Sequence, residues 1–443
     1  MREIITSIYT NASKHGDDVS KIVELDENAI AAIIADGVST CTSGRIASSF
    51  LTYYINEYLK KNYKKESRVE ELEDLASSAI EYGAQELVNF NSTVGSVSAL
   101  LQVFYKKSND LKNEYERDLN KIVQHLTNLK ADLEKKNEEK IAETKAHEKV
   151  RAIIDDKRAW GYFKNIFGPS DKEIEIEKFK SLQEKGNINI ENEIKELNDK
   201  IQKTLADKIN VDEKIASVDY FQNNITVIGF KKEKLPNYLL EDDLYNKIVK
   251  DAEQVSNQLL SIIKETLNEG EKERDVYQKI QIELLKTIKK GEKPLFKSNL
   301  CLAFLIKRTR KEKQEYRLHT FVLGDPEVRV ISIRNKDNKE VYLKSSSAAL
   351  TSFVSNDVKL GIQGSIDFKS ISVKEDDFVI LASDGANIRY NKSNTFPYTY
   401  FINTIDSYEK DGKTADLAKL WYQQLSKENA ISDDFSLITF KVK

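Results

Sequence analysis

Acidic residues stand at the ends of apolar, strand-like runs at several points in this sequence. Three of them follow such a run and adjoin a glycine: Asp36, Asp325 and Asp384. Two pairs precede such a run: Asp17–Asp18 and Asp433–Asp434. If the strands lie side by side these carboxylates converge, and like charges packed together repel one another or take up protons. A divalent cation removes this conflict, and oxygen ligands without His or Cys favour Mg2+ or Mn2+.

A turn is the alternative for each position taken singly, because Asp beside Gly is ordinary turn chemistry. The chemistry therefore depends on elements that bring the positions together. Residues 1–64 begin with β-branched runs and then take helical spacing, and residues 292–443 alternate apolar and polar residues as antiparallel strands do. Residues 65–291 are mainly helix-forming, with many Lys and Glu. We therefore predict an α+β domain, residues 1–106 and 292–443, interrupted by a helical insertion at residues 107–291.

The predicted insertion carries two apolar seams at heptad spacing. The first runs from Leu119 to Leu133 and the second from Ile190 to Leu205. The segment Trp160–Ser170 between them contains Gly and Pro and interrupts the helical pattern. Each seam must be buried against something, so we predict an antiparallel, coiled-coil-like hairpin with its core at about residues 107–216. Separate solvated helices on a globular core are the alternative.

The composition excludes several classes of protein. The 443 residues include 69 basic and 72 acidic ones, a formal charge of −3, which argues against a surface built for nucleic acid. Two cysteines cannot form a disulfide scaffold, and we expect a reducing cytoplasm. The longest apolar run, Ala29–Ala35, is too short to cross a bilayer, and Met1–Ala12 lacks the pattern of a signal peptide. We therefore expect no membrane contact.

Four segments repeat the strand-end pattern in a particular order. ADGVSTCTSGRIAS, from Ala35, has Asp-Gly, a short loop and a helix start; LGDPEVRVI has Gly-Asp, DDFVILASDG has Ser-Asp-Gly, and SDDFSLITF has Asp-Asp before a strand. In this order they resemble the motifs of the metal-dependent protein serine/threonine phosphatases of type 2C. The resemblance covers about residues 1–60 and 292–443, and it implies two packed antiparallel sheets flanked by helices.

The resemblance also implies a set of site residues and a reaction. The implied metal ligands are Asp18, Asp36, Gly37 through its carbonyl, Asp325, Asp384 and Asp433. Asp36 would bridge two Mn2+ or Mg2+ ions, and Asp325 would bind a third, weaker one. Asp18 and Asp36 are therefore catalytic candidates as well. The implied reaction is hydrolysis of phosphoserine or phosphothreonine by a water activated between the two ions.

The chain departs from the family pattern beside this predicted site. Ser39 and Thr40 replace two glycines, and the family's phosphate-binding Arg before the first Asp is absent. Lys14 or His15 is the nearest substitute donor, although Lys does not reproduce a bidentate Arg clamp, and we place Lys14 among the catalytic candidates. All the ligand carboxylates remain, so we predict an active enzyme. The alternative is a catalytically weak pseudophosphatase that binds phosphoproteins or acts as a scaffold.

The expected partners follow from the same resemblance. It implies a phosphorylated protein substrate, which would be a Ser/Thr kinase or the target of one. We expect the helical insertion to recruit a substrate or partner, or to mediate self-association.

Overall fold

The computed structural model describes residues 4–11, 14–65, 67–155, 171–224, 242–310, 313–332, 341–343, 352–357, 359, 361–386, 398–431 and 433–442. It divides into two compact units. We call the first, residues 1–105, 224–233 and 240–443, the sheet unit; the second, residues 106–223 and 234–239, is the helical arm. The predicted interruption at Trp160–Ser170 lies outside the described residues.

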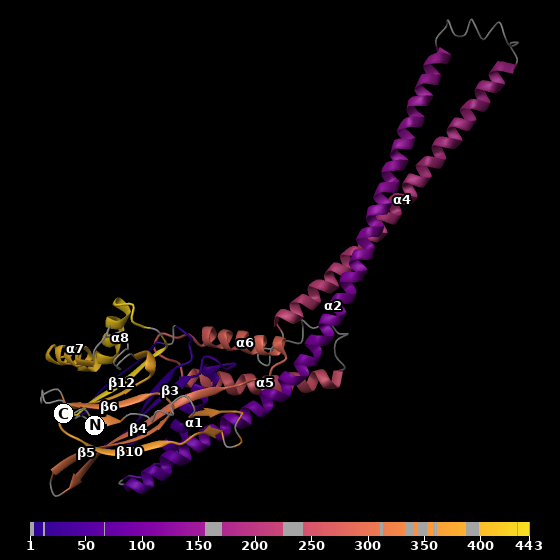
Figure 1. Cartoon of the computed structure of the whole chain (residues 1–443). Coiled ribbons are helices and arrows are strands. Elements are labelled where there is room, and N and C mark those ends of the chain that lie inside the picture. The colour runs from indigo at the N-terminus through magenta and orange to yellow at the C-terminus, as the bar shows by residue number, and fades with distance from the viewer. Residues whose placement is uncertain are drawn as a thin grey trace. The chain divides into compact units, whose positions relative to one another are not determined.

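Two antiparallel sheets form the sheet unit (Figure 1). The first has the order β1 (Ile4–Asn11), β12 (Phe435–Val442), β11 (Asp377–Ala382), β6 (Glu327–Ser332), β7 (Val341–Leu343). The second has the order β10 (Asp367–Val373), β5 (Lys313–Leu323), β4 (Lys297–Arg310), β3 (Ala29–Gly37), β2 (Val19–Glu24), with β8 (Phe353–Ser355) on β4 and β9 (Ile362–Gln363) on β8. Strands from both ends of the chain therefore pair within each sheet.

The main core lies between the two sheets. β-branched and other apolar side chains alternate along the strands, so one face of each strand points into the core. Ile34 and Leu305 of the second sheet meet Val379 and Phe440 of the first in one buried cluster. Each such side chain contributes roughly 1.5–3 kcal/mol relative to an exposed one. This packing holds the strand ends that carry the acidic residues.

Helices cover the outer faces of both sheets. Helix α1 (Gly44–Asn62) packs on β3, β2 and β4. Helices α7 (Tyr398–Lys410) and α8 (Leu417–Lys427), with the short turns η3 (Asp384–Ala386) and η4 (Thr414–Asp416), cover the first sheet around the buried Trp421. Helix α5 (Asp242–Glu265) packs on α1 and on α6 (Glu273–Lys290). Figure 1 shows α5 and α6 beside the labelled strands of this unit.

Helix α2 (Val69–Asp155) begins in the sheet unit and continues into the arm. In the sheet unit its Phe90 lies 4.3 Å from Phe50 of α1, ring centre to ring centre. A stretch of this helix is long and apolar enough to cross a membrane by length and composition alone. Several of its apolar residues in the sheet unit, such as Leu72 and Leu87, are buried there, whereas Val103 is exposed.

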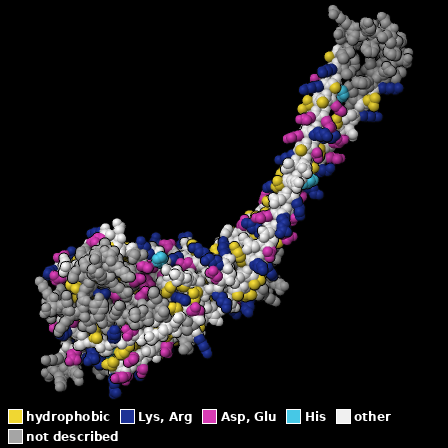
Figure 2. All heavy atoms as spheres, viewed as in Figure 1, with side chains coloured by type: hydrophobic (Ala, Val, Ile, Leu, Met, Phe, Trp, Pro, Cys, Tyr) yellow, Lys and Arg dark blue, Asp and Glu magenta, His cyan; other side chains and the backbone are white. Residues whose placement is uncertain are grey.

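The arm is an antiparallel pair made by α2 and α4 (Asp171–Asn224). Leu126 and Leu129 of α2 and Ile201 of α4 form its buried centre, flanked by other residues of the two predicted seams. Ion pairs follow the same antiparallel order, from Lys112–Asp219 to Lys140–Glu191. Figure 2 shows basic and acidic side chains interspersed along both helices.

The predicted fold class is confirmed: two packed antiparallel sheets flanked by helices, with an inserted helical hairpin. Among the described residues, the two units differ from the predicted division mainly at residues 242–291. Helices α5 and α6 fall within residues 107–291, which we assigned to the insertion, but they pack in the sheet unit. Their apolar faces are buried against α1 and against each other, and a helical period cannot indicate which neighbour a helix has.

Candidate functional site

The strand ends bring the predicted acidic residues into one cluster. Asp36 is the last residue but one of β3, and its pKa responds to the charges of Asp18, Asp325 and Asp384. The pKa of Asp384, just after β11, responds in turn to Asp433 and Asp434. We call Asp18, Asp36, Asp325, Asp384, Asp433 and Asp434 the acidic cluster. These residues are separated by up to about the whole chain, and only the pairing of β1, β12, β11 and β6 and of β2 with β3 brings them together.

Burial and mutual repulsion disfavour negative charge in this cluster. Burial raises the pKa of Asp18 to about 8, and the charge of Asp434 adds to the rise. Burial likewise holds the pKa of Asp36 well above its usual value. Asp384 is partly exposed, yet the surrounding protein raises its pKa to about 6 by withdrawing it from water, and Asp325 and Asp433 add to this. The cluster is therefore a place where a positive charge is stabilised.

Asp434 ties the loop before β2 to the start of β12. Its Oδ1 accepts hydrogen bonds from the backbone N–H groups of Lys14 and His15, both at 2.9 Å, and its Oδ2 accepts one from Asp17 at 2.8 Å. A Cβ on Gly385 would lie 1.9 Å from the Asp434 carbonyl oxygen, so only glycine fits there. Asp434 is buried and holds backbone, whereas its neighbour Asp433, the predicted ligand, is only half-buried.

Lys14, the predicted phosphate donor, meets the cluster through its backbone. Its N–H donates to Asp434, and the residue is exposed. The neighbouring His15 has its Nε2 atom 3.7 Å from Oδ1 of Asp433. The catalytic role of Lys14 stays a prediction.

Asn299 is a site residue that the sequence analysis missed. It lies on β4 directly opposite Asp36 of β3. Its Nδ2 donates to Oδ1 of Asp325 at 2.5 Å, so it links two members of the acidic cluster. Gly324 has φ of 100°, and a Cβ there would lie 2.3 Å from Oδ1 of Asn299, which makes glycine necessary before Asp325. The polar Asn in the otherwise apolar run NLCLAFLI was the available signal.

Gly37, the predicted carbonyl ligand, sits in a close backbone crossing. A Cβ on Gly37 would lie 2.6 Å from Cβ of Asp17 and 2.7 Å from the carbonyl carbon of Gly44. A Cβ on Gly44 would in turn lie 2.7 Å from the carbonyl carbon of Gly37. The two glycines let the start of α1 approach the end of β3, and this contact fixes the backbone beside Asp36.

Residues of the turn between α5 and α6, together with Arg45, hold the backbone of Asp18 in place. Arg45 of α1 is fully buried, and its guanidinium pairs with both carboxylate oxygens of Glu271 at 2.9 and 2.7 Å. It also donates to the carbonyl oxygens of Asp18 at 3.2 Å and Thr266 at 3.1 Å. Nδ2 of Asn268 donates to the same Asp18 carbonyl at 2.8 Å. We call this arrangement the Arg45 clamp.

Lys279 of α6 brings a positive charge to the edge of the site. Its Nζ lies 3.1 Å from Oδ1 of the buried Asp17 and 3.5 Å from Oε1 of Glu283. The partners that hold Arg45 and Asp18 in the clamp, Glu271, Thr266 and Asn268, come from residues that the sequence analysis assigned to the insertion, and so does Lys279. No motif marked them, because their partners are about 250 positions away.

The donor chemistry of the cluster fits a hard divalent cation. Its members offer carboxylate oxygens, and the Oδ2 atom of Asp18 is buried without a hydrogen-bond partner. Asp18 and Asp36 each change the pKa of the other, so the two carboxyl groups lie close together. Among the residues that the structure describes, no three acidic, His or Cys side chains are placed to hold one ion as they stand. The ligand roles of Asp18, Asp36, Gly37, Asp325, Asp384 and Asp433 therefore stay predictions.

Comparison with known proteins gives structural likenesses only. No protein-family model and no curated protein matches the chain. Similar solved structures include a serine/threonine phosphatase of S. agalactiae, 9% identical with a TM-score of 0.36, matched over 99% of this chain and 100% of that one. They also include the phosphatase Stp1 of Staphylococcus aureus, 9% identical with a TM-score of 0.34, over 99% and 94%. A third is the catalytic domain of the phosphatase PstP in complex with two manganese ions, 6% identical with a TM-score of 0.35, over 99% and 97%.

Proposed function

We propose that this chain is a Mn2+- or Mg2+-dependent phosphatase acting on phosphoserine and phosphothreonine in proteins. One observation carries the proposal: carboxylates from separate strand ends lie close enough to raise one another's pKa values. Burying like charges costs free energy unless a cation or a proton compensates for it, so the cluster does not serve stability by itself. The order of the four sequence motifs supports the same reading.

The chain's residues would divide the work as follows. Two divalent ions, when bound, lower the pKa of a water molecule and neutralise charge on phosphoryl oxygens. Asp36 is the candidate for a shared ligand, because it responds to Asp18, Asp325 and Asp384 together. Asp434 and the Arg45 clamp fix the backbone on both sides of Asp18.

A thiol nucleophile fits this site poorly. Cys41 lies in the loop after Asp36, but burial raises the pKa of its thiol to about 12. Its Sγ donates a hydrogen bond to the carbonyl oxygen of Val38 at 2.8 Å. A thiolate, not a thiol, is the attacking species in thiol phosphatases, so direct attack by an activated water is the better match.

The test is hydrolysis of p-nitrophenyl phosphate with and without Mn2+. We expect hydrolysis that Mn2+ stimulates and that a chelator removes. Calorimetric titration adds a readout that does not depend on turnover: Asp384→Asn and Asp433→Asn should each weaken Mn2+ binding by about 10- to 100-fold. Asp411→Asn is the matched control, since Asp411 is exposed and pairs with Lys413 away from the cluster. Unchanged Mn2+ affinity in both cluster variants would contradict the ligand assignment.

A pseudophosphatase is the second candidate, and one observation favours it. Lys14 contacts the cluster through its backbone N–H, and a lysine side chain cannot reproduce the bidentate geometry of Arg. In that case the protein would bind Mn2+ and a phosphopeptide without turning over p-nitrophenyl phosphate.

We propose a cytoplasmic setting and a phosphorylated protein substrate, which would be a Ser/Thr kinase or its target. We also propose that the helical arm mediates self-association or recruits a partner. Sedimentation of the whole chain over a range of concentrations tests the self-association, and a single monomeric species at every concentration would contradict it.

A further inference from the structure

A hollow of about 520 Å3 lies beside the acidic cluster, within the sheet unit. One wall is the loop after β3, residues 39–44, and the other is helix α6 with the segment after it. Asp17 reaches into the lining, and Asp17 is joined through its N–H to Asp434 of the cluster. We call this hollow the α6 pocket.

Hydrogen bonds hold the two walls together. The backbone N–H of Thr42 donates to the carbonyl oxygen of Leu295 at 2.7 Å, and the N–H of Leu295 donates to Oγ1 of Thr42 at 2.9 Å. Oγ1 of Thr287 on α6 lies 3.3 Å from Oγ1 of Thr42. Helix α6 then ends at Lys290, and Gly291, which has φ of 71°, turns the chain towards β4. The shape of the pocket is therefore fixed by hydrogen bonds between its two walls.

Lysines dominate the charge of this pocket. Lys286, Lys290 and Lys293 line it with exposed side chains. Of the acidic residues in the lining, Asp17 and Glu283 both face Lys279, whose single positive charge offsets one of these two carboxylates. Glu292 is the remaining acidic residue of the lining. The balance in the open part of the pocket is positive, next to a cluster that is negative.

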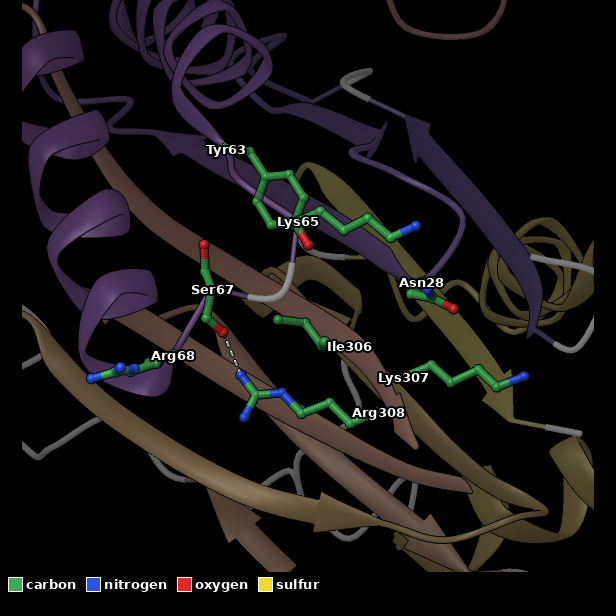
Figure 3. A pocket seen from close by; sticks show the side chains of 8 residues that line it. All are labelled: Asn28, Tyr63, Lys65, Ser67, Arg68, Ile306, Lys307 and Arg308. Atoms are coloured by element: carbon green, nitrogen blue, oxygen red, sulfur yellow. Dashed lines mark hydrogen bonds between the residues drawn. The ribbon is translucent and has the colours of Figure 1, made fainter. Parts of the chain in front are cut away.

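In a second basic pocket of the sheet unit, the positive side chains do not point to a common side. It has a volume of about 370 Å3 and includes Lys65, Arg68, Lys307 and Arg308. Figure 3 shows Arg68 pointing to one side, and Lys65 and Lys307 to the other. Arg308 donates to the carbonyl oxygen of Ser67 at 2.6 Å, and Lys65 lies 2.5 Å from Glu27. This pocket also adjoins Asn28, at the opposite end of β3 from Asp36.

We propose that the α6 pocket binds acidic residues that flank the phosphorylated side chain of a protein substrate. The proposal rests on the proposed phosphatase function and names the class of substrate. Lys286 and Lys290 are one turn apart, about 6 Å along the helix axis. Acidic side chains at alternate positions of an extended peptide are spaced about 6.6–7 Å apart, which matches this distance. Lysine ammonium groups suit such a segment, because they attract carboxylates without demanding a fixed geometry.

The test compares two neighbouring charge reversals on α6. Lys290→Glu changes the pocket, whereas Lys289→Glu places the same change on an adjacent exposed lysine that is outside the lining. The probes are fluorescein-labelled phosphoserine peptides with flanking Asp residues or flanking Lys residues, and binding is measured by anisotropy at low salt. We expect Lys290→Glu to weaken binding of the Asp-flanked peptide by about five- to tenfold relative to Lys289→Glu, and to strengthen binding of the Lys-flanked one.

Three outcomes would overturn the proposal. They are equal binding by the two variants, wild-type preference for the Lys-flanked peptide, and tighter binding of a single-stranded oligonucleotide than of the Asp-flanked peptide. Hydrolysis of p-nitrophenyl phosphate separates this test from the proposed function, since neither lysine belongs to the acidic cluster. If the wild-type protein lacks hydrolysis but Lys290→Glu still weakens the Asp-flanked peptide, the catalytic proposal fails and the pocket stands. If hydrolysis is present and the two variants bind alike, the pocket assignment fails alone.

Discussion

The acidic cluster and the helical arm use the same residue types in opposite ways. In the arm, Nζ of Lys136 lies 2.8 Å from Glu139 and 2.9 Å from Glu193, and the hydrogen bond from Lys136 lowers the pKa of Glu139. In the cluster, Asp36 has other carboxylates as neighbours, and burial with their charges raises its pKa. Paired charges in water contribute little to stability. Unpaired charges out of water store a repulsion that a bound cation can relieve.

The Arg45 clamp is a third use of charge, intermediate between these two. Arg45 is fully buried, and Glu271 is largely so. Removing one member of a buried ion pair leaves an uncompensated charge, which costs far more than the loss of an exposed pair. Mutations that remove one charged residue should therefore change stability differently in the clamp, the cluster and the arm.

The largest expected effect is that of Asp36→Asn. It should lower Mn2+-dependent hydrolysis of p-nitrophenyl phosphate by at least about 100-fold, because a shared ligand cannot lose its charge without loosening both ions. In a chelator the same variant should unfold at a higher temperature than wild type, because it removes one of the repelling carboxylates. Activity and thermal unfolding by circular dichroism are the two measurements. If Asp36→Asn keeps full activity, or unfolds at a lower temperature than wild type in the chelator, the carboxylates of the cluster do not repel one another or bind ions as proposed.

The next effect is expected from Glu271→Ala. Leaving the buried Arg45 unpaired should lower the free energy of unfolding by about 3–5 kcal/mol, measured by urea denaturation. Glu271→Gln should cost less, because the amide oxygen still accepts one of the two hydrogen bonds from Arg45. If the Glu271→Gln variant folds, we also expect it to bind Mn2+ more weakly than wild type in a calorimetric titration, because the clamp holds the backbone of Asp18. If Glu271→Ala unfolds like wild type, the clamp does not hold this part of the protein.

A smaller effect is expected from removal of most of the arm. Nε2 of Gln222 lies 3.1 Å from Oγ of Ser108, so the two ends of the hairpin are close at its base. Replacing residues 109–221 by a short Gly/Ser linker should therefore leave hydrolysis of p-nitrophenyl phosphate within a few-fold of wild type. Turnover of a phosphoprotein or self-association should fall. An insoluble or inactive shortened chain would mean that the arm supports the core of the sheet unit.

The smallest effect is expected from Lys136→Ala in the arm. Its ion pairs with Glu139 and Glu193 are exposed, so the midpoint of thermal unfolding should not change measurably at physiological salt. The comparison with Glu271→Ala isolates burial, because both variants remove one partner of an ion pair. A loss of stability in Lys136→Ala equal to that in Glu271→Ala would refute the distinction drawn between the arm and the clamp.

The sequence by itself indicated the main strands, the paired helices and the acidic residues at the strand ends. Apolar alternation, with Asp beside Gly at the strand ends, predicted the strands next to which Asp36, Asp325 and Asp384 lie, and heptad spacing predicted the paired helices of the arm. These signals are local: a strand period, a helix period and the residue after a strand can all be read within about ten positions.

Only the tertiary structure decided which residues surround the cluster. Asn299 stands beside Asp36 because β3 pairs with β4 in one particular register. Glu271 and Lys279 reach Arg45 and Asp17 because α5 packs on α1 and α6 packs on α5. An amphipathic helix has the same pattern whichever apolar surface it covers, so its neighbours depend on the packing of segments far away in the chain. For that reason the boundary of the insertion, the Arg45 clamp and the lysines of the α6 pocket could not be predicted from the sequence.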